Sequence, residues 1–185
     1  QLLKLSWVYE LPFGPGRALL SSSKGVVARL LDGWMISGYF NASSGAPLSI
    51  SHSLGRPIVL RNPSKSGPVG ERLGLDQDPV TGRPLNSFFD INAFAPLPNQ
   101  YTISPTEPYL DWLRGPGSWN LNLSLVKNMR ISESVRFQLR FDATNATNSP
   151  HWGSPGTDMS NAATFGVIRD AGGGRSMQVG IRLQF

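Results

Sequence analysis

The last ten residues of the chain alternate between apolar and polar side chains. Odd positions from Met177 to Phe185 are apolar, and even positions from Ser176 to Gln184 are polar or glycine. This period of two residues predicts a β-strand with one apolar and one polar face, because successive side chains of a strand point to opposite faces. The chain ends on the aromatic Phe185, and aromatic residues at strand ends are typical of the interface girdles of membrane barrels. Taken alone, this strand fits either a membrane β-barrel or a soluble β-sandwich.

Four other segments show the same alternation, so we expect five strands in all. The strands lie near residues 2–11, 33–50, 119–130, 135–145 and 176–185. Aromatic residues near their predicted ends favour an interface girdle over a soluble core. These aromatic residues are Trp7, Tyr9, Trp34, Trp119, Phe137 and Phe185. The sequence therefore predicts an all-β fold, an antiparallel transmembrane β-barrel segment of about five strands of a larger barrel, with long extracellular loops.

The connections between these strands differ sharply in length. Residues 130–134 form a tight connection between the third and fourth strands, whereas the loop of residues 52–118 joins the second and third. Short periplasmic turns and longer extracellular loops are typical of outer-membrane barrels. Phe185 therefore belongs at the periplasmic rim, and the first, third and fifth strands run toward that rim. The connection of residues 12–33 is unusually long for a periplasmic turn.

Part of this first connection has a helical pattern. Apolar residues recur at helical spacing between Ser23 and Asp32, and Ser23 is a candidate N-cap. The pattern predicts a short helix, and a covered loop is the alternative.

Composition excludes several classes of protein. The chain has no cysteine, which excludes a disulfide framework, a thiolate nucleophile and a cysteine-ligated metal. No apolar stretch approaches about 18 residues, so no transmembrane helix is expected, whereas barrel strands need only about 9–11 residues. The 17 basic residues are scattered despite a net charge of +5. Because nucleic-acid binding needs a clustered basic patch, we expect no nucleic-acid partner.

Candidate catalytic and metal-binding residues are few. His52 and His151 are the only histidines. Both lie in predicted loops, and no nucleophile or acid accompanies either at a fixed spacing. We therefore expect polar surface residues, no enzyme activity and no cofactor. The stretch from Asp76 to Asp78 begins like a calcium loop, but Val80 and Thr81 stand where a ligand and the glycine belong, which excludes an EF-hand. A looser calcium site in this loop stays open.

The first residues already follow the strand pattern. No basic segment followed by an apolar run opens the sequence, so it shows no signal peptide. We expect the chain to be a fragment or a processed piece of a longer protein.

Three short motifs, in a fixed order, carry a resemblance to a known family. They are Tyr-Glu-Leu-Pro-Phe-Gly at residues 9–14, Leu-Asp-Gly-Trp-Met-Ile-Ser-Gly at residues 31–38 and Leu-Arg-Gly-Pro-Gly-Ser-Trp-Asn at residues 113–120. Residues 123–128, 136–142 and 165–185 extend the likeness. With these motifs the chain resembles the C-terminal barrel of TonB-dependent outer-membrane receptors, in particular the large Oar-like type with a carboxypeptidase-regulatory-like N-terminal domain. The resemblance covers most of the chain except the long middle loop.

This resemblance implies a barrel of about 22 strands around a plug, in the cell outer membrane of a Gram-negative bacterium. The family takes up scarce, large substrates with energy delivered through TonB. The family's plug domain and TonB box have no counterpart in this sequence, and residues 143–148 lack the aromatic that often follows the penultimate strand. The chain would then correspond to the last five strands and would not transport alone. The alternative is a soluble β-sandwich binding module, such as a lectin or adhesin domain, with the long loop as its binding surface.

The polar face of the last two strands supplies the candidate site residues. Its predicted lumen-facing residues are Arg136, Gln138, Arg140, Asp142, Gln178 and Arg182. They would contact the plug or water, or bind substrate directly, because lumen residues tune selectivity. The resemblance also implies that the barrel-assembly machinery reads an assembly signal made of Val179, Ile181, Leu183 and Phe185. The expected partners are outer-membrane lipid, the remaining barrel and plug of the same receptor, that machinery, and the TonB complex through the plug.

Overall fold

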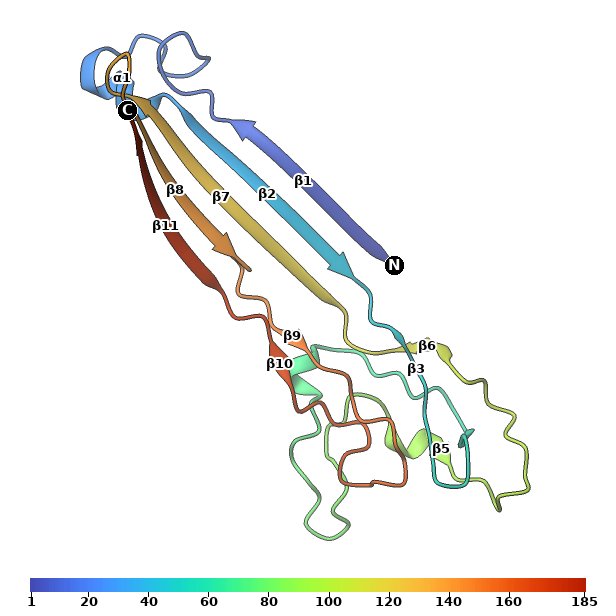
Figure 1. Cartoon of the computed structure of the whole chain (residues 1–185). Helices are drawn as coiled ribbons and strands as arrows, with labels where there is room; N and C mark the ends of the chain where they lie inside the picture. The colour runs from blue at the N-terminus through green and yellow to red at the C-terminus, as the bar shows by residue number, and fades with distance from the viewer. The chain divides into compact units, whose positions relative to one another are not determined.

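Five long strands form one sheet in which they follow the order of the chain (Figure 1). The computed structural model describes residues 1–185. The strands are β1 (Leu2–Glu10), β2 (Trp34–Ser43), β7 (Ser118–Arg130), β8 (Arg136–Thr144) and β11 (Ser176–Gln184). Neighbouring strands run antiparallel, so the predicted all-β antiparallel fold is confirmed. No helix is both long enough and apolar enough to cross a membrane.

The chain divides into two compact units. The first contains residues 1–42, 119–149 and 173–185, and we call it the sheet unit. The second contains residues 43–118 and 150–172, and we call it the loop unit.

The strand register separates the sheet into two faces. Leu125 on β7 lies opposite Phe141 on β8, which in turn lies opposite Val179 on β11. The neighbouring row pairs Asp142 with Gln178. Because successive side chains of a strand alternate between faces, the first row belongs to an apolar face and the second to a polar face.

The predicted second strand, residues 33–50, forms in its first part only. β2 ends at Ser43, and the short strand β3 (Pro47–Leu48) pairs with β6 (Leu110–Arg114) in a separate sheet. The break lies at Gly45, where a Cβ atom would come within 1.8 Å of the carbonyl oxygen of Gly115. Only glycine permits so close an approach of two backbones. The segments that contain Gly45 and Gly115 therefore run side by side after they leave the long sheet.

The connection between β1 and β2 contains the helix α1 (Gly25–Leu31). The helical pattern is therefore confirmed, but the predicted cap is wrong. Lys24 occupies the N-cap position, and the Ser23 hydroxyl donates to the carbonyl oxygen of Leu20 instead. Beyond the helix, Gly33 has a φ of +75°, and a Cβ there would lie 2.1 Å from the carbonyl oxygen of Asn128. Glycine is thus required where β2 begins beside β7.

Both long connections of the sheet contribute to the loop unit. The backbone N–H of Ser51 donates to the carbonyl oxygen of Thr157 (3.0 Å), and that of Ile168 donates to Leu73 (2.9 Å). Beside β3 and β6, the unit contains two further pairs of short strands and two 3-10 helices. The remaining elements are β4 (Ile58–Val59) paired with β5 (Phe94–Ala95), β9 (His151–Trp152) paired with β10 (Ala171–Gly172), η1 (Val69–Glu71) and η2 (Ile91–Ala93).

The loop unit has a hydrophobic core of its own. The rings of Phe89, Phe94 and Phe165 form three edge-to-face pairs, with centroids 5.2 to 5.8 Å apart. Phe89 is completely buried, and Leu110 and Ile168 belong to the same cluster. Such ring pairs stabilise a core by more than the burial of their apolar area alone would. Residues 52–118 show no sustained periodicity, yet side chains from both connections order them.

Candidate functional site

The six predicted lumen-facing residues share the polar face of the sheet. Gln138 lies opposite Arg182, Asp142 lies opposite Gln178, and Arg140 and Arg136 occupy the same alternation on β8. The Arg140 guanidinium pairs with the Asp142 carboxylate at 2.7 Å. Gln138 donates from its amide to the side-chain oxygen of Asn128 on β7 (2.9 Å). The register thus brings these residues together, whereas the sequence indicated only that they share an alternation.

The same face carries an open hollow of about 610 Å³. Its polar lining comes from four neighbouring strands, so it extends across the sheet. The polar lining residues are Ser6, Ser37, Asn122, Ser124, Arg140, Asp142 and Thr144. The hollow offers one ion pair among uncharged hydroxyl and amide groups. Such a surface can hydrogen-bond water or a polar solute, and it presents no nucleophile–base pair.

The residues of the predicted assembly signal lie on the apolar face or at its end. Val179, Ile181 and Leu183 pair with Phe141, Leu139 and Phe137 of β8. All four signal residues are exposed, from Leu183 at 46% to Phe185 at 91%. Exposed apolar rows are expected on a face that contacts lipid. The inner face of a soluble sandwich would instead be covered by a second sheet.

Lys127 on β7 is a cation on the apolar face, and sequence analysis did not single it out. It lies opposite Leu139 and is 4% exposed. Its ammonium group donates to the carbonyl oxygens of Arg29 (2.7 Å) and Asp32 at the end of α1. It also lies 5.4 Å from the centre of the Trp34 ring. A charged residue at an apolar position of a strand was the signal that could have identified it, because such a charge needs a partner.

Lys127→Met is expected to loosen α1 from the sheet by about 1–3 kcal/mol, because two carbonyl oxygens lose a charged donor. Trypsin cleavage after Lys24 and Arg29 should accelerate accordingly in the folded protein. Lys4→Met removes the same charge from an exposed position and should leave the cleavage rate unchanged. An equal rate for Lys127→Met and the unaltered protein would show that Lys127 does not hold the helix.

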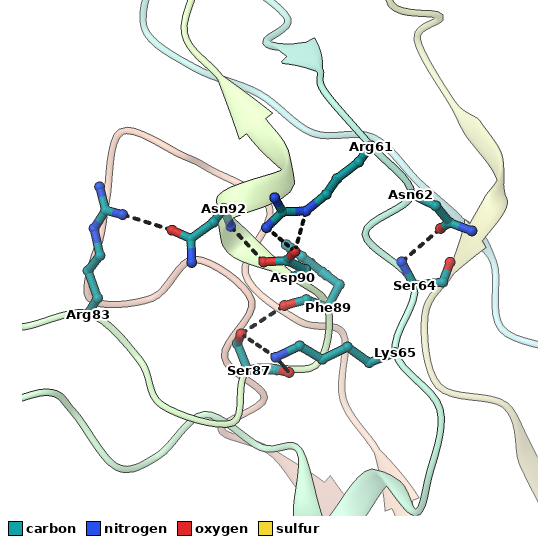
Figure 2. A network of polar contacts seen from close by, with 9 residues as sticks. All are labelled: Arg61, Asn62, Ser64, Lys65, Arg83, Ser87, Phe89, Asp90 and Asn92. Carbon is teal, nitrogen blue, oxygen red and sulfur yellow. Dashed lines mark hydrogen bonds and ion pairs between the residues drawn. The ribbon is translucent and has the colours of Figure 1, made fainter.

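Figure 2 shows a polar network in the loop unit that is built around Asp90. One carboxylate oxygen of Asp90 accepts two hydrogen bonds from Arg61, at 2.7 and 2.9 Å. The other oxygen accepts the backbone N–H of Asn92 (3.0 Å), which caps η2. The side-chain oxygen of Asn92 in turn accepts a hydrogen bond from Arg83 (3.0 Å). One carboxylate therefore joins two separate segments of the loop.

A second group of contacts surrounds Ser87, which is almost completely buried. Its hydroxyl donates to the carbonyl oxygen of Phe89 (2.7 Å), and its own carbonyl accepts from the Lys65 ammonium (3.1 Å) (Figure 2). Nearby, the Arg72 guanidinium donates to the carbonyl oxygens of Lys65 (2.7 Å) and Phe88 (3.0 Å). Lys65 and Arg72 thus donate hydrogen bonds to backbone carbonyl oxygens that lie outside the paired strands.

Between these groups lies a polar hollow of about 350 Å³. Its charged lining residues are Lys65, Asp78, Arg83 and Asp90, with Asn86, Ser87 and Asn92 beside them. Both hydrogen-bond donors and acceptors line this hollow, so it can hydrogen-bond a polar ligand. Apart from Asp78, which belongs to the candidate calcium loop, the sequence offered no signal for these lining residues, because they come from an aperiodic segment.

Two carboxylates of this hollow have lowered pKa values. Partial burial alone would raise the pKa of Asp90, but the hydrogen bonds from Arg61 and Asn92 outweigh it and hold the pKa below its ordinary value of 3.8. Backbone N–H groups of Thr81 and Val80 lower the pKa of Asp78. Both donate to one Asp78 oxygen at 2.8 Å. Asp78 thus closes a local turn.

The lowered pKa of Asp90 predicts a loss of stability in acid. Because the folded state binds this proton less readily than the unfolded state, the contribution of Asp90 is complete well above pH 3.8 and disappears as the pH falls below that value. We expect a loss of about 0.2–1 kcal/mol, since the Arg61 side chain is 61% exposed and solvent screens the pair. Urea unfolding followed by tryptophan fluorescence can measure it, since Trp152 packs against the core. Asp90→Asn should remove this part of the pH dependence, and an unchanged profile would contradict the assignment.

The two histidines occupy separate structural positions. His52 forms a small turn, in which its Nδ1 accepts the backbone N–H of Leu54 (3.2 Å). His151 lies in β9. No group of three or more His, Asp or Glu side chains is placed so that it could hold a metal ion.

A comparison with protein families now connects these observations. The model of the outer membrane beta barrel domain matches residues 1–178, which is nearly the whole chain. Searches of curated proteins and of solved structures give no significant match. The family match indicates a location in the outer membrane, in agreement with the sheet's exposed apolar face. The chain therefore belongs to the family of outer membrane β-barrel domains.

Proposed function

We propose that this chain is the C-terminal barrel segment of a TonB-dependent receptor that takes up a scarce substrate with energy from TonB. The proposal is supported by the ordered motifs at residues 9–14, 31–38 and 113–120. Two of them lie at structurally demanding positions. Gly33 precedes β2 and lies against the backbone of Asn128, and Gly115 lies against Gly45 in the segments that leave the sheet.

The single observation that carries the proposal is the loop unit. Two connections of the sheet fold together around one core, and they expose a polar hollow of about 350 Å³. A barrel that only anchors a protein in the membrane does not need an ordered loop unit, whereas a receptor needs an ordered surface to recognise its substrate. We place substrate recognition at this hollow and expect no catalytic site or cofactor.

The sheet also needs further strands. β1 and β11 are the edge strands, and each has one edge without a partner. Unpaired backbone groups are costly in lipid, and five strands are fewer than the smallest barrels contain. We infer that the remaining barrel strands pair with these edges and that the polar face lines a lumen filled by a plug. Membrane lipid and the barrel-assembly machinery complete the proposed partners.

TonB binding by the full-length protein tests this proposal. The purified periplasmic domain of TonB should be retained by the folded protein in detergent. Deletion of the segment that precedes the barrel should abolish retention and leave the barrel folded, as judged by heat-dependent mobility in a denaturing gel. A folded full-length protein that retains no TonB would contradict the receptor function.

A further inference from the structure

The helix α1 exposes three apolar side chains on one side. Val26, Val27 and Leu30 are 73%, 57% and 59% exposed. Since successive residues of a helix differ by about 100°, these three lie within one arc of about 100°. The buried Ala28 lies on the opposite side. The helix thus packs one side against the protein and presents an apolar arc outward.

The contacts of α1 place it on the apolar face of the sheet. Lys127 projects from the same row of β7 as Leu125, and its ammonium group binds the carbonyl oxygens of Arg29 and Asp32. The indole N–H of Trp34, the first residue of β2, donates to the carbonyl oxygen of Leu30 (2.8 Å). The C-terminal end of the helix therefore rests on the face that contacts lipid in an outer-membrane barrel.

The helix also lies at one rim of the sheet. It connects the end of β1 to the start of β2, at the same end as the β7–β8 turn and the C-terminus (Figure 1). On the lipid side of a barrel, a rim is the boundary between acyl chains and headgroups.

We infer that α1 is an interfacial helix that places Val26, Val27 and Leu30 among the acyl chains of the phospholipid leaflet at this rim. Lipid is the occupant because Lys127 and Trp34 hold the C-terminal end of the helix against the apolar face of the sheet, which is the face that contacts lipid. The exposed Lys24 and Arg29 adjoin the arc, and their charge is complementary to that of headgroup phosphates. Amphipathic helices with basic residues beside the apolar side lie at this depth. The inference depends on the outer-membrane location and not on TonB.

A fluorescent probe on one introduced thiol can test the inference, because the chain contains no cysteine. An environment-sensitive dye would be attached to Val27→Cys in the protein folded into vesicles of phosphatidylethanolamine and phosphatidylglycerol. Arg29→Cys, which lies beside the arc on the same helix at the proposed headgroup depth, is the matched control, and Val80→Cys, which is 91% exposed in the loop unit, reports water. Quenchers attached to lipid acyl chains and aqueous iodide then measure the surroundings of each dye.

The dye at Val27 is expected to be quenched several-fold more strongly by the lipid-attached quencher than the dyes at Arg29 and Val80. Iodide should show the reverse order. Iodide quenching at Val27 equal to that at Val80 would place the helix in water and overturn the inference. Protection of Val27 from both quenchers would also overturn it, because another protein segment would then cover the arc.

Discussion

Phe89→Ala is expected to destabilise the loop unit by about 3–5 kcal/mol, the range found when a buried phenylalanine is truncated. The ring is completely buried and contacts both Phe94 and Phe165 edge to face. Phe165 comes from the second long connection, so the cavity would open where the two connections meet. The expected loss is a large fraction of the stability of a body of this size.

Protease cleavage of the folded protein can measure this loss, because cleavage of an ordered loop tracks the population of its open form. Cleavage sites within residues 43–118 should become accessible at a lower urea concentration in Phe89→Ala. Tyr101→Ala removes a ring that is 85% exposed and should leave the midpoint unchanged. If both variants open at the same urea concentration, the three phenylalanines do not form the core.

Leu123→Arg is expected to destabilise the barrel by about 2–4 kcal/mol, the cost of a cation on the lipid face near the middle of the membrane. Leu123 lies in the middle of β7, opposite Ala143 on the apolar face. It lines an apolar hollow together with Ile36 and Val179. An arginine there would project into hydrocarbon with no carboxylate on its face.

Ser124→Arg is the matched control, since it introduces the same residue one position along the same strand. Ser124 lies on the polar face opposite Asp142, so the new guanidinium has a carboxylate and water within reach. We expect it to be tolerated. The comparison uses the urea midpoint of folding into lipid vesicles, read from heat-dependent gel mobility. Equal midpoints for the two variants would contradict the assignment of an apolar, lipid-facing side and a polar side to the sheet.

The alternation in the sequence predicted the long strands because it reports which side chains share a face. β8 and β11 lie within the predicted residues 135–145 and 176–185. Alternation does not report where a strand leaves its sheet. β2 therefore ends at Ser43, inside the predicted range 33–50, because the constraint at Gly45 is the backbone of Gly115, which lies far away in the sequence.

The candidate site was predictable to a smaller extent. Shared alternation placed Arg140, Asp142 and Gln178 on one face, as the register has them. The network of Arg61, Asp90 and Lys65 was not predictable, because it joins residues of an aperiodic loop across separations of more than twenty positions. Such pairs form only after a core has positioned their backbones.

The sequence by itself determined the antiparallel strands, their two faces and the contrast between short and long connections. These properties follow from local periodicity and from glycine and proline positions, which act within a few residues. Only the tertiary structure decided that the two long connections form one ordered unit around Phe89, and that Lys127 holds α1 on the apolar face. The ordered loop unit and the position of α1 both depend on contacts between residues that are distant in the sequence, such as Lys127 and Arg29. The free energy gained by burying these contacts outweighs the weak local conformational preferences of each segment.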